Sequence, residues 1–345
     1  MKIKNLVQFS NIDVRSEKEF NKGTIPGSVN FPILIDSHFE QIGKEYKNKG
    51  KEAAVTLGFK LVNGDFKENL INSWENHIFN NPGCLVFCYR GGMRSQIALE
   101  WLSKRNIIIN RLEKGYKKFR SNILAQHQDK NKYKKDWIII GGLTGSGKTE
   151  FIKGYKENID LEDIANHRGS AFGRKKTNQP TQANFENILT AKYLDHQFPQ
   201  LLLEDESRTI GRAGLPGCWY EKMQISKLVV IEIEHEERLE NIYDEYICQE
   251  IKIINDEEEL FNKYSNALDR IKRRLGNSLH GEIREFMTRG FGHNDKEAHK
   301  KWISILLTNY YDKMYNYKLG IRQKDIVHRG SKSSCQKYLK SIIKE

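Results

Sequence analysis

Two short segments carry residue types that attack or bind phosphorylated compounds, and they lie about fifty residues apart. The first reads Cys88-Tyr-Arg90-Gly91-Gly92-Met-Arg94-Ser95. An apolar run before it and a helical pattern after it predict that the cysteine sulfur lies at a helix N-terminus, among backbone N–H groups. Such surroundings lower the pKa of a thiol and keep it nucleophilic. A buried, inert thiol is the alternative, and the two flanking arginines disfavour it.

The second segment has the spacing of a phosphate-binding loop and reads Gly142-Leu-Thr-Gly145-Ser146-Gly147-Lys148-Thr149. An apolar strand pattern precedes it and a helical pattern follows it, which is the context that this motif needs. Backbone N–H groups of such a loop cradle phosphate oxygens, Lys148 reaches a terminal phosphate, and Thr149 can hold Mg²⁺ when a metal is present. The motif indicates a diphosphate or a triphosphate without selecting ATP. A glycine turn that binds nothing is the alternative.

Charged residues beyond the two loops could complete either site. Glu204 and Asp205 end an apolar run, as acidic residues that hold Mg²⁺ often do, although acidic residues commonly cap strands without binding a metal. Several basic residues are expected near the mouth of the phosphate loop, where they could contact RNA phosphates or a diphosphate. These are Arg168, Arg174, Lys175, Lys176, Arg208 and Arg212. Each of them alone is also explained as a solvated surface charge.

The overall composition favours a polyanionic partner and a reducing compartment. The chain has 345 residues, a formal net charge of +12 and an isoelectric point near 9.2, which suits nucleic acid. Its five cysteines lack CxxC or Cys/His spacing, so neither a disulfide framework nor a zinc site is predicted. No apolar stretch approaches membrane-spanning length. We therefore expect a soluble, cytoplasmic protein without a membrane partner.

The elements that would position these residues belong to the α/β class. Short apolar runs at 6–9, 12–14, 85–87 and 107–109 alternate with helical patterns, which predicts an open sheet over residues 1–128. A polar, lysine-rich stretch at 129–136 predicts a linker. Strand patterns at 137–140, 201–204 and 228–233 predict a second, parallel α/β domain over 137–345, whose C-terminal part from Glu257 is mostly helical.

The cysteine loop fits two chemistries. A Cys-x5-Arg loop wraps a tetrahedral phosphate in phosphatases, and rhodanese-type sulfurtransferases use a closely related loop to carry a persulfide. The segment Ile12-Asp-Val-Arg15-Ser through Ile25-Pro-Gly-Ser-Val-Asn30-Phe-Pro32 resembles the stretch that opens rhodanese domains. Residues 37–72 look like an insertion into such a domain, and the sequence assigns them no role.

A rhodanese-like domain followed by a P-loop domain resembles the family of bacterial tRNA 2-selenouridine synthases. The resemblance covers almost the whole chain and includes further motifs, namely His167-Arg-Gly-Ser-Ala-Phe-Gly173, Gln179-Pro-Thr-Gln182, Glu204-Asp-Glu-Ser-Arg208, Ile210-Gly-Arg212 and Arg322-x-x-Asp-Ile326. It implies an enzyme that acts on the wobble 2-thiouridine of tRNA. The implied reaction is S-geranylation by geranyl diphosphate, followed by replacement of the geranylthio group with selenium from selenophosphate.

The resemblance also implies roles for the two loops. Gly142, Gly145, Ser146, Gly147, Lys148 and Thr149 would hold the diphosphate of geranyl diphosphate. Cys88 would take selenium as a perselenide, while Arg94, Arg90 and the amides of Gly91 and Gly92 hold the phosphate of selenophosphate. No tightly bound cofactor and no protein-held metal set is predicted, and the partners are tRNA and, as a donor of selenophosphate, the enzyme that produces it.

Three other functions remain open at this level. An ATP-using sulfurtransferase would activate its RNA at the P-loop and deliver sulfur from the cysteine loop. An RNA-binding regulator would sense anions at both loops without turnover. A stand-alone phosphatase would leave the P-loop domain idle.

Overall fold

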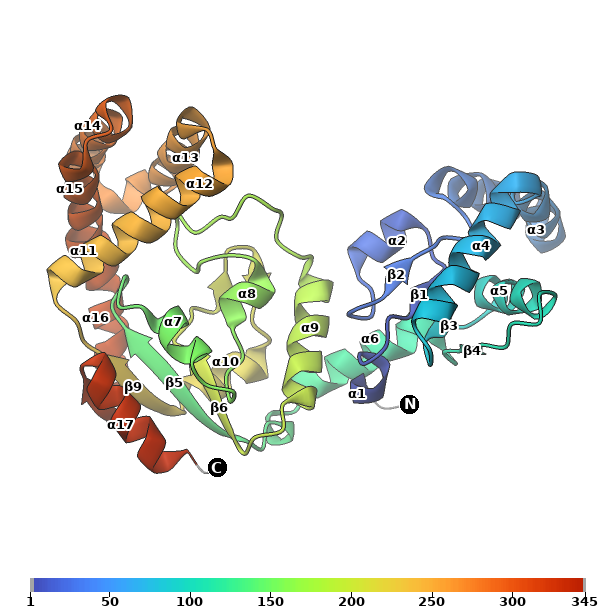
Figure 1. Cartoon of the computed structure of the whole chain (residues 1–345), viewed down its shortest axis with the longest axis horizontal. Coiled ribbons are helices and arrows are strands. Elements are labelled where there is room, and N and C mark those ends of the chain that lie inside the picture. The colour runs from blue at the N-terminus through green and yellow to red at the C-terminus, as the bar shows by residue number, and fades with distance from the viewer. Residues whose placement is uncertain (1–2, 344–345) are drawn as a thin grey trace. The chain divides into compact units, whose positions relative to one another are not determined.

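The computed structural model describes residues 3–343, and its contacts divide them into two compact units (Figure 1). Unit 1 extends to Asp129 and also contains Pro180–His196. Unit 2 contains Lys130–Gln179 and the chain from Gln197 onward. The first two residues of the predicted domain 1–128 and the last two of 137–345 lie outside the described residues. The segment 180–196 was predicted to belong to the domain 137–345, but it packs in unit 1.

Unit 1 is built on a four-stranded parallel sheet with the order β2-β1-β3-β4. Its strands are β1 (Ile12–Asp13), β2 (Val29–Asn30), β3 (Leu85–Phe87) and β4 (Asn110–Arg111). Its helices are α1 (Ile3–Leu6), α2 (Glu17–Lys22), α3 (Asp36–Leu61), α4 (Gly64–Asn80), α5 (Met93–Ser103), α6 (Gly115–His127) and α9 (Gln182–Asp195). This arrangement confirms the predicted open α/β sheet. The apolar run at 6–9 does not form a strand, because Leu6 ends helix α1 and Asn11 donates a hydrogen bond to its carbonyl at 2.7 Å.

Helix α9 joins unit 1 through buried polar contacts that the sequence pattern does not reveal. Asn187 is fully buried and donates hydrogen bonds to the carbonyl of Thr24 at 2.8 Å and to the hydroxyl of Tyr116 at 3.2 Å. Arg120 pairs with Glu186 and donates to the Asn187 side chain at 3.0 Å. An amide buried with its partners satisfied fixes one packing arrangement. These contacts explain why the segment leaves the domain to which its sequence position assigned it.

Unit 2 contains a second parallel sheet, with the order β10-β9-β5-β6. Its strands are β5 (Asp136–Gly142), β6 (Gln200–Glu204), β9 (Lys227–Ile231) and β10 (Ile326–Gly330), and β7 (Thr209–Ile210) and β8 (Ala213–Gly214) form a separate hairpin. Strand β5 lies between β6 and β9 and is buried from Trp137 to Gly142. A fully apolar strand with parallel neighbours on both sides is expected to be covered on both faces. The strand predictions at 137–140, 201–204 and 228–233 are confirmed to within about two residues.

Helices flank this sheet and also form a separate layer in the C-terminal part (Figure 1). They are α7 (Lys148–Lys153), α8 (Leu161–Ala165), α10 (Gly217–Gln224), α11 (His235–Tyr243), α12 (Gln249–Ile254), α13 (Glu257–Leu275), α14 (Asn277–His293), α15 (Lys296–Leu306), α16 (Asp312–Ile321) and α17 (Lys332–Ile342). Short 3₁₀ and π segments join some of them: η1 (Lys130–Lys132), η2 (Asp244–Cys248), η3 (Leu307–Tyr311) and η4 (Gln323–Asp325). None of the helices in residues 3–343 is both long and apolar enough to cross a membrane.

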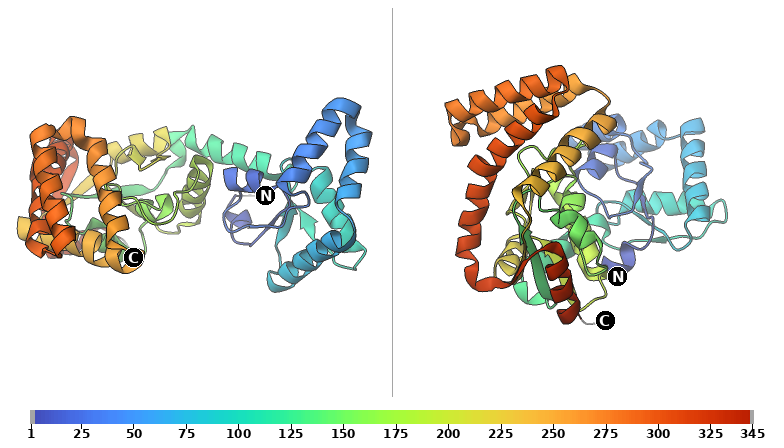
Figure 2. Two further views of the ribbon diagram at one scale, coloured as in Figure 1. Left: turned by 90° about the horizontal axis from the view of Figure 1, so that it is seen from above. Right: turned by 60° about the vertical axis from the view of Figure 1, so that its left-hand side comes forward.

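The C-terminal helices pack on their own apolar core before the chain returns to the sheet. Helices α13, α14 and α15 lie side by side (Figure 2), and Tyr264, Leu268 and Trp302 are almost completely buried between them. The chain then forms β10, which pairs with β9, and α17, whose Cys335 and Leu339 pack on the sheet core. The helical region is therefore confirmed, and the sheet strand that ends it was not predicted.

Candidate functional sites

Cys88 lies where β3 ends and the loop to α5 begins, and it is buried. Its sulfur lies 3.3 Å from the hydroxyl oxygen of Ser95 and 3.9 Å from the carbonyl oxygen of Gly92. Ser95 is the third residue of α5, and its hydroxyl also lies 3.0 Å from the Gly92 carbonyl oxygen, to which it can donate. The thiol is thus placed at the N-terminus of a helix, as predicted.

The surroundings of Cys88 favour its thiolate. Burial raises the pKa of this thiol, but hydrogen bonds from the Ser95 hydroxyl and backbone N–H and the nearby charge of Arg94 outweigh burial and lower the pKa below its ordinary value. Cys84, at the start of the same buried run, lacks these donors, and burial raises its pKa. Of the two, only Cys88 therefore has surroundings that favour a nucleophilic thiolate.

Arg94 does not stand free at the loop. Its guanidinium pairs with both carboxylate oxygens of Glu19, at 3.0 Å for Nη2 and Oε1 and more closely for the second pair. The ring of Phe39 lies 5.2 Å from the guanidinium carbon. Burial raises the pKa of Glu19, yet the ion pair with Arg94 outweighs it and holds that pKa below its usual value. An anion arriving at Arg94 would share or displace Glu19, which the sequence did not indicate.

The start of α6, at Gly115 and Tyr116, contacts the cysteine loop. Gly91 has a φ of +66° and Gly115 a φ of +55°, a region that disfavours side chains. A Cβ on Gly115 would lie 2.2 Å from the carbonyl oxygen of Cys88. Tyr116 donates its backbone N–H to the same carbonyl at 3.0 Å. Gly115 was not predicted as a site residue, although it contacts the Cys88 carbonyl directly. Arg90 is exposed and has no ion pair among the described residues.

The phosphate loop of unit 2 connects β5 to α7, as its motif predicts. Gly145 and Gly147 have φ values of +85° and +74°, conformations that turn successive N–H groups toward one side. Lys148 donates to the carbonyl of Gly142 at 2.8 Å and lies 3.4 Å from that of Leu143. Its ammonium group thus folds back on the loop. The Ser146 hydroxyl is buried and has no hydrogen-bond partner among the described residues.

Helix α11 holds the phosphate loop from its outer side. The buried Arg238 donates to the carbonyl of Thr144 at 2.8 Å and pairs with Asp312 at 2.5 and 3.0 Å. Asn241 donates to the carbonyl of Gly145 at 2.9 Å. Both bonds engage loop carbonyls as acceptors and so help to fix the conformation of the loop backbone. Neither Arg238 nor Asn241 was predicted.

Three carboxylates gather beside the phosphate loop. Thr149 donates its hydroxyl to Glu204 at 3.1 Å, and one oxygen from each of Glu162, Glu204 and Glu206 lies within 4.8 Å of the others. Burial raises the pKa of Glu204, and the charge of Glu206 raises it further. Burial also raises the pKa of Glu162, and the charges of Glu204 and Glu206 add to this effect. The other Glu204 oxygen, Oε1, is buried without a hydrogen-bond partner among the described residues. The sequence did not indicate this cluster, because Glu162 lies 42 residues from Glu204. The expectation that the protein holds no metal stays a prediction.

Three of the arginines expected near the phosphate loop occupy different surroundings. Arg168 is paired with Glu245 at 2.8 Å and Glu250 at 2.7 Å and lies over the ring of Tyr246, so it is tied into the protein rather than free for phosphate. Arg212 is exposed at the turn between β7 and β8. Arg208 is exposed ahead of the same hairpin. Asp205, predicted as a second acidic ligand, instead pairs with Arg322 at 2.8 Å.

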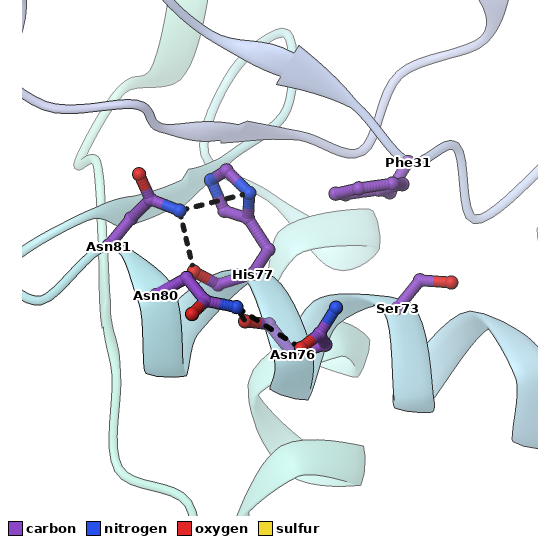
Figure 3. Close-up of a pocket in the computed structure, with 6 residues that line it drawn as sticks. All are labelled: Phe31, Ser73, Asn76, His77, Asn80 and Asn81. Atoms are coloured by element: carbon purple, nitrogen blue, oxygen red, sulfur yellow. Dashed lines mark hydrogen bonds between the residues drawn. The ribbon is translucent and has the colours of Figure 1, made fainter.

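A hollow in unit 1 lies apart from both loops (Figure 3). Its lining residues are Phe31, Ser73, Asn76, His77, Asn80 and Asn81. His77 contacts the Ser10 carbonyl through its Nε2 at 2.7 Å, and Asn81 donates to the His77 carbonyl at 2.9 Å. The side chains of His77 and Asn81 thus already have partners within the protein, and none of the lining residues belongs to the cysteine loop or the phosphate loop.

Comparison with known proteins connects both units to one family. Residues 135–345 match the model described as the tRNA 2-selenouridine synthase AAA domain, and residues 2–122 match the rhodanese-like domain. The tRNA 2-selenouridine synthase of Shewanella woodyi is 39% identical over 342 residues, which cover 95% of this chain and 93% of the relative. The protein of the same name from Shewanella denitrificans is 40% identical, and the match covers 96% of this chain and 94% of that relative.

Proposed function

Because the chain belongs to the family of tRNA 2-selenouridine synthases, we propose that it replaces the sulfur of a wobble 2-thiouridine by selenium in two steps, one at each loop. The observation that carries this proposal is that two anion-binding loops are built separately, and only the loop with Cys88 contains a nucleophile of lowered pKa. A thiocarbonyl sulfur leaves poorly until it is alkylated. A prenyl transfer followed by a selenium transfer therefore uses one phosphorylated donor at each loop.

The first step is geranylation at the phosphate loop. The uridine sulfur attacks C1 of geranyl diphosphate, a carbon–sulfur bond forms, and the carbon–oxygen bond breaks with its electron pair leaving on diphosphate. Loop N–H groups and Lys148 would neutralise the charge that develops on this leaving group. Lys148 now donates to the carbonyls of Gly142 and Leu143, and it would exchange them for phosphate oxygens. The unpartnered Ser146 hydroxyl is a further donor in the same loop.

A Mg²⁺ ion fits the residues beside this loop. Hydroxyl and carboxylate oxygens are ligands that Mg²⁺ prefers, and Glu204 has a buried oxygen without a partner next to the carboxylates of Glu162 and Glu206. Thr149 and Glu204 would hold the ion, and when bound it would supply positive charge to the departing diphosphate. Burial and then the neighbouring carboxylates raise the pKa values of Glu162 and Glu204, and a bound cation would lower them.

The second step is selenium transfer at the cysteine loop. The selenium of selenophosphate attacks the ring carbon, and geranylthiolate leaves and takes up a proton. The Cys88 thiolate then attacks phosphorus, the phosphorus–selenium bond breaks with its electrons on selenium, and 2-selenouridine and a phosphocysteine result. Water releases phosphate from the cysteine. We prefer this route to the perselenide expected from the sequence, because forming a perselenide from selenophosphate with release of phosphate needs a two-electron oxidant.

Nucleoside mass spectrometry tests the proposed function. Purified protein and 2-thiouridine tRNA are incubated with geranyl diphosphate, selenophosphate or both. Geranylated nucleoside with the first donor and selenouridine only with both are the expected results. Acid-quenched Cys88 peptide should carry phosphorus from ³²P-labelled selenophosphate and lack the selenium isotope pattern. ATP turnover without either modified nucleoside would refute the proposal in favour of the sulfurtransferase alternative.

A further inference from the structure

The insertion at residues 37–72 begins with a helix that contributes almost nothing to the core of unit 1. Of the 26 residues of α3, only Ala54 is buried. Gly50 has a φ of +83° and divides α3 into two segments. A Cβ on Gly58 would lie 3.5 Å from the Ile42 side chain, so the two segments lie against each other as a helical hairpin. A helical hairpin with so little burial gains little stability from the hydrophobic effect.

Large aromatic side chains are exposed along this hairpin. Phe39 is 40% exposed, Tyr46 58% and Phe59 49%. Phe39 and Tyr46 are seven residues apart on one helical segment, which places them on the same face about two turns apart. Exposed aromatic residues that share a face commonly mark a binding surface.

Lysines without partners accompany these aromatic rings. Lys44, Lys47 and Lys51 are exposed, and none of them forms an ion pair within residues 3–343. Two of the acidic residues nearby are already engaged, since Glu40 pairs with Lys18 and Glu45 with Lys49. Aromatic rings interleaved with free lysines are the combination that binds unpaired nucleotides, through base stacking and phosphate contacts.

The hairpin also reaches the cysteine loop. The ring of Phe39 lies 5.2 Å from the guanidinium carbon of Arg94, and the Cys88 pKa is lowered in part by the charge of that arginine. In the same first turn, the carboxylate of Asp36 accepts a hydrogen bond from the Lys18 backbone at 3.1 Å. His38 packs edge-on against Phe66 of α4, with 5.7 Å between the ring centroids. These contacts hold the Phe39 end of the aromatic face beside Arg94 of the cysteine loop.

We propose that the α3 hairpin is the RNA-binding arm of unit 1 and that it presents the anticodon loop to Cys88. Unpaired bases stack on Phe39 and Tyr46, and Lys44 and Lys47 hold the neighbouring phosphates. The inference rests on the proposed function in one respect, namely that the RNA is a tRNA whose wobble base reacts at the cysteine loop. A modified wobble base lies in an unpaired loop, where protein recognition by stacking is expected.

Binding of a fluorescent anticodon stem-loop to the full-length protein, followed by anisotropy, tests the arm. Tyr46→Ala should weaken binding about tenfold, and Phe39→Ala should do the same. The double variant Lys44→Glu/Lys47→Glu should also lower the slope of log affinity against log salt by about two. Phe79→Ala is the matched control, because Phe79 lies in α4 of the same unit and is 85% exposed; it should bind like the unchanged protein. Circular dichroism of each variant checks that the helices remain.

The proposal is overturned if the Tyr46→Ala variant and the lysine variant bind the anticodon stem-loop with the same affinity as Phe79→Ala. An equal loss for a duplex RNA without a loop also overturns it, because stacking on the arm requires unpaired bases. A surface that instead recognises a protein donor of selenophosphate would give the first of these results. The arm variants could bind the anticodon stem-loop more weakly while the unchanged protein forms neither geranylated nor selenated nucleoside. That outcome would refute the proposed function and still support the α3 hairpin as an RNA-binding arm.

Discussion

The hydroxyl of Ser95 is predicted to set much of the reactivity of Cys88. Its oxygen lies 3.3 Å from the sulfur and 3.0 Å from the carbonyl oxygen of Gly92, and it has one proton to donate. In the thiol state this proton can go to the carbonyl, and in the thiolate state it turns to the sulfur. The Ser95→Ala variant removes the hydroxyl and keeps the backbone N–H that also lowers the Cys88 pKa.

The expected size of this effect follows from the energy of one charge-assisted hydrogen bond. Such a bond contributes about 1.5–3 kcal/mol, and about 1.4 kcal/mol corresponds to one pKa unit. Because the hydroxyl loses its bond to Gly92 when it turns to the sulfur, the lower end applies. We expect the Cys88 pKa to rise by about one unit in Ser95→Ala, with about tenfold less thiolate at pH values below that pKa.

Alkylation by iodoacetamide as a function of pH measures this change. The background replaces Cys218 and Cys248, the two partly exposed cysteines, by serine, while the buried Cys84 and Cys335 stay. Ser103→Ala, at the exposed C-terminal end of the same helix, is the control. An apparent pKa in Ser95→Ala within about 0.3 units of the control would refute the role assigned to the hydroxyl.

Three further predictions concern stability. Burial and the neighbouring carboxylates raise the pKa of Glu162, so this residue keeps a proton in the folded state that it releases on unfolding above pH 4.5. The contribution of Glu162 to the stability of unit 2 should therefore be greatest below the unfolded pKa near 4.5 and should fall as the pH rises toward the folded pKa. Thermal unfolding of Glu162→Gln should lack this decline, and a pH profile equal to that of the unchanged protein contradicts this account. Gly115→Ala should destabilise unit 1 by about 1–3 kcal/mol, because its Cβ meets the Cys88 carbonyl; an unchanged urea midpoint would exclude that contact. Arg238→Met leaves Asp312 unpaired and should cost unit 2 about 3–5 kcal/mol in chemical unfolding, and a loss below about 1 kcal/mol would show that the pair is solvated.

Local patterns predicted the positions of both loops. Cys88 follows β3 and precedes α5, and Lys148 begins the helix after β5, because an apolar strand, a glycine-rich turn and a helical pattern adjoin in sequence. The same reasoning gave the α/β class of both units. The helix that begins at Lys148 is short and ends at Lys153, before Gly154.

Contacts between distant residues were not predictable from one sequence. Glu19 meets Arg94 across 75 positions, and Glu250 meets Arg168 across 82; nothing local marks either carboxylate as the partner of its arginine. Two arginines expected to bind phosphate are therefore paired within the protein. Among the aromatic residues of 301–318, Trp302 and Tyr310 are core residues, whereas Tyr315 accepts a hydrogen bond from the backbone N–H of Gly142 at 2.6 Å. Helical spacing alone did not separate these roles.

The central claim is that each loop carries one step, and supplying the intermediate tests it most directly. Lys148→Ala and Cys88→Ser proteins receive either 2-thiouridine tRNA or tRNA already geranylated at that base, with both donors present, and nucleosides are then quantified by mass spectrometry. We predict that Lys148→Ala forms selenouridine only from the geranylated tRNA, and that Cys88→Ser geranylates the first tRNA and forms selenouridine from neither. Failure of Lys148→Ala to convert the geranylated tRNA, or selenouridine formed at the unchanged rate by Cys88→Ser, would contradict the assignment.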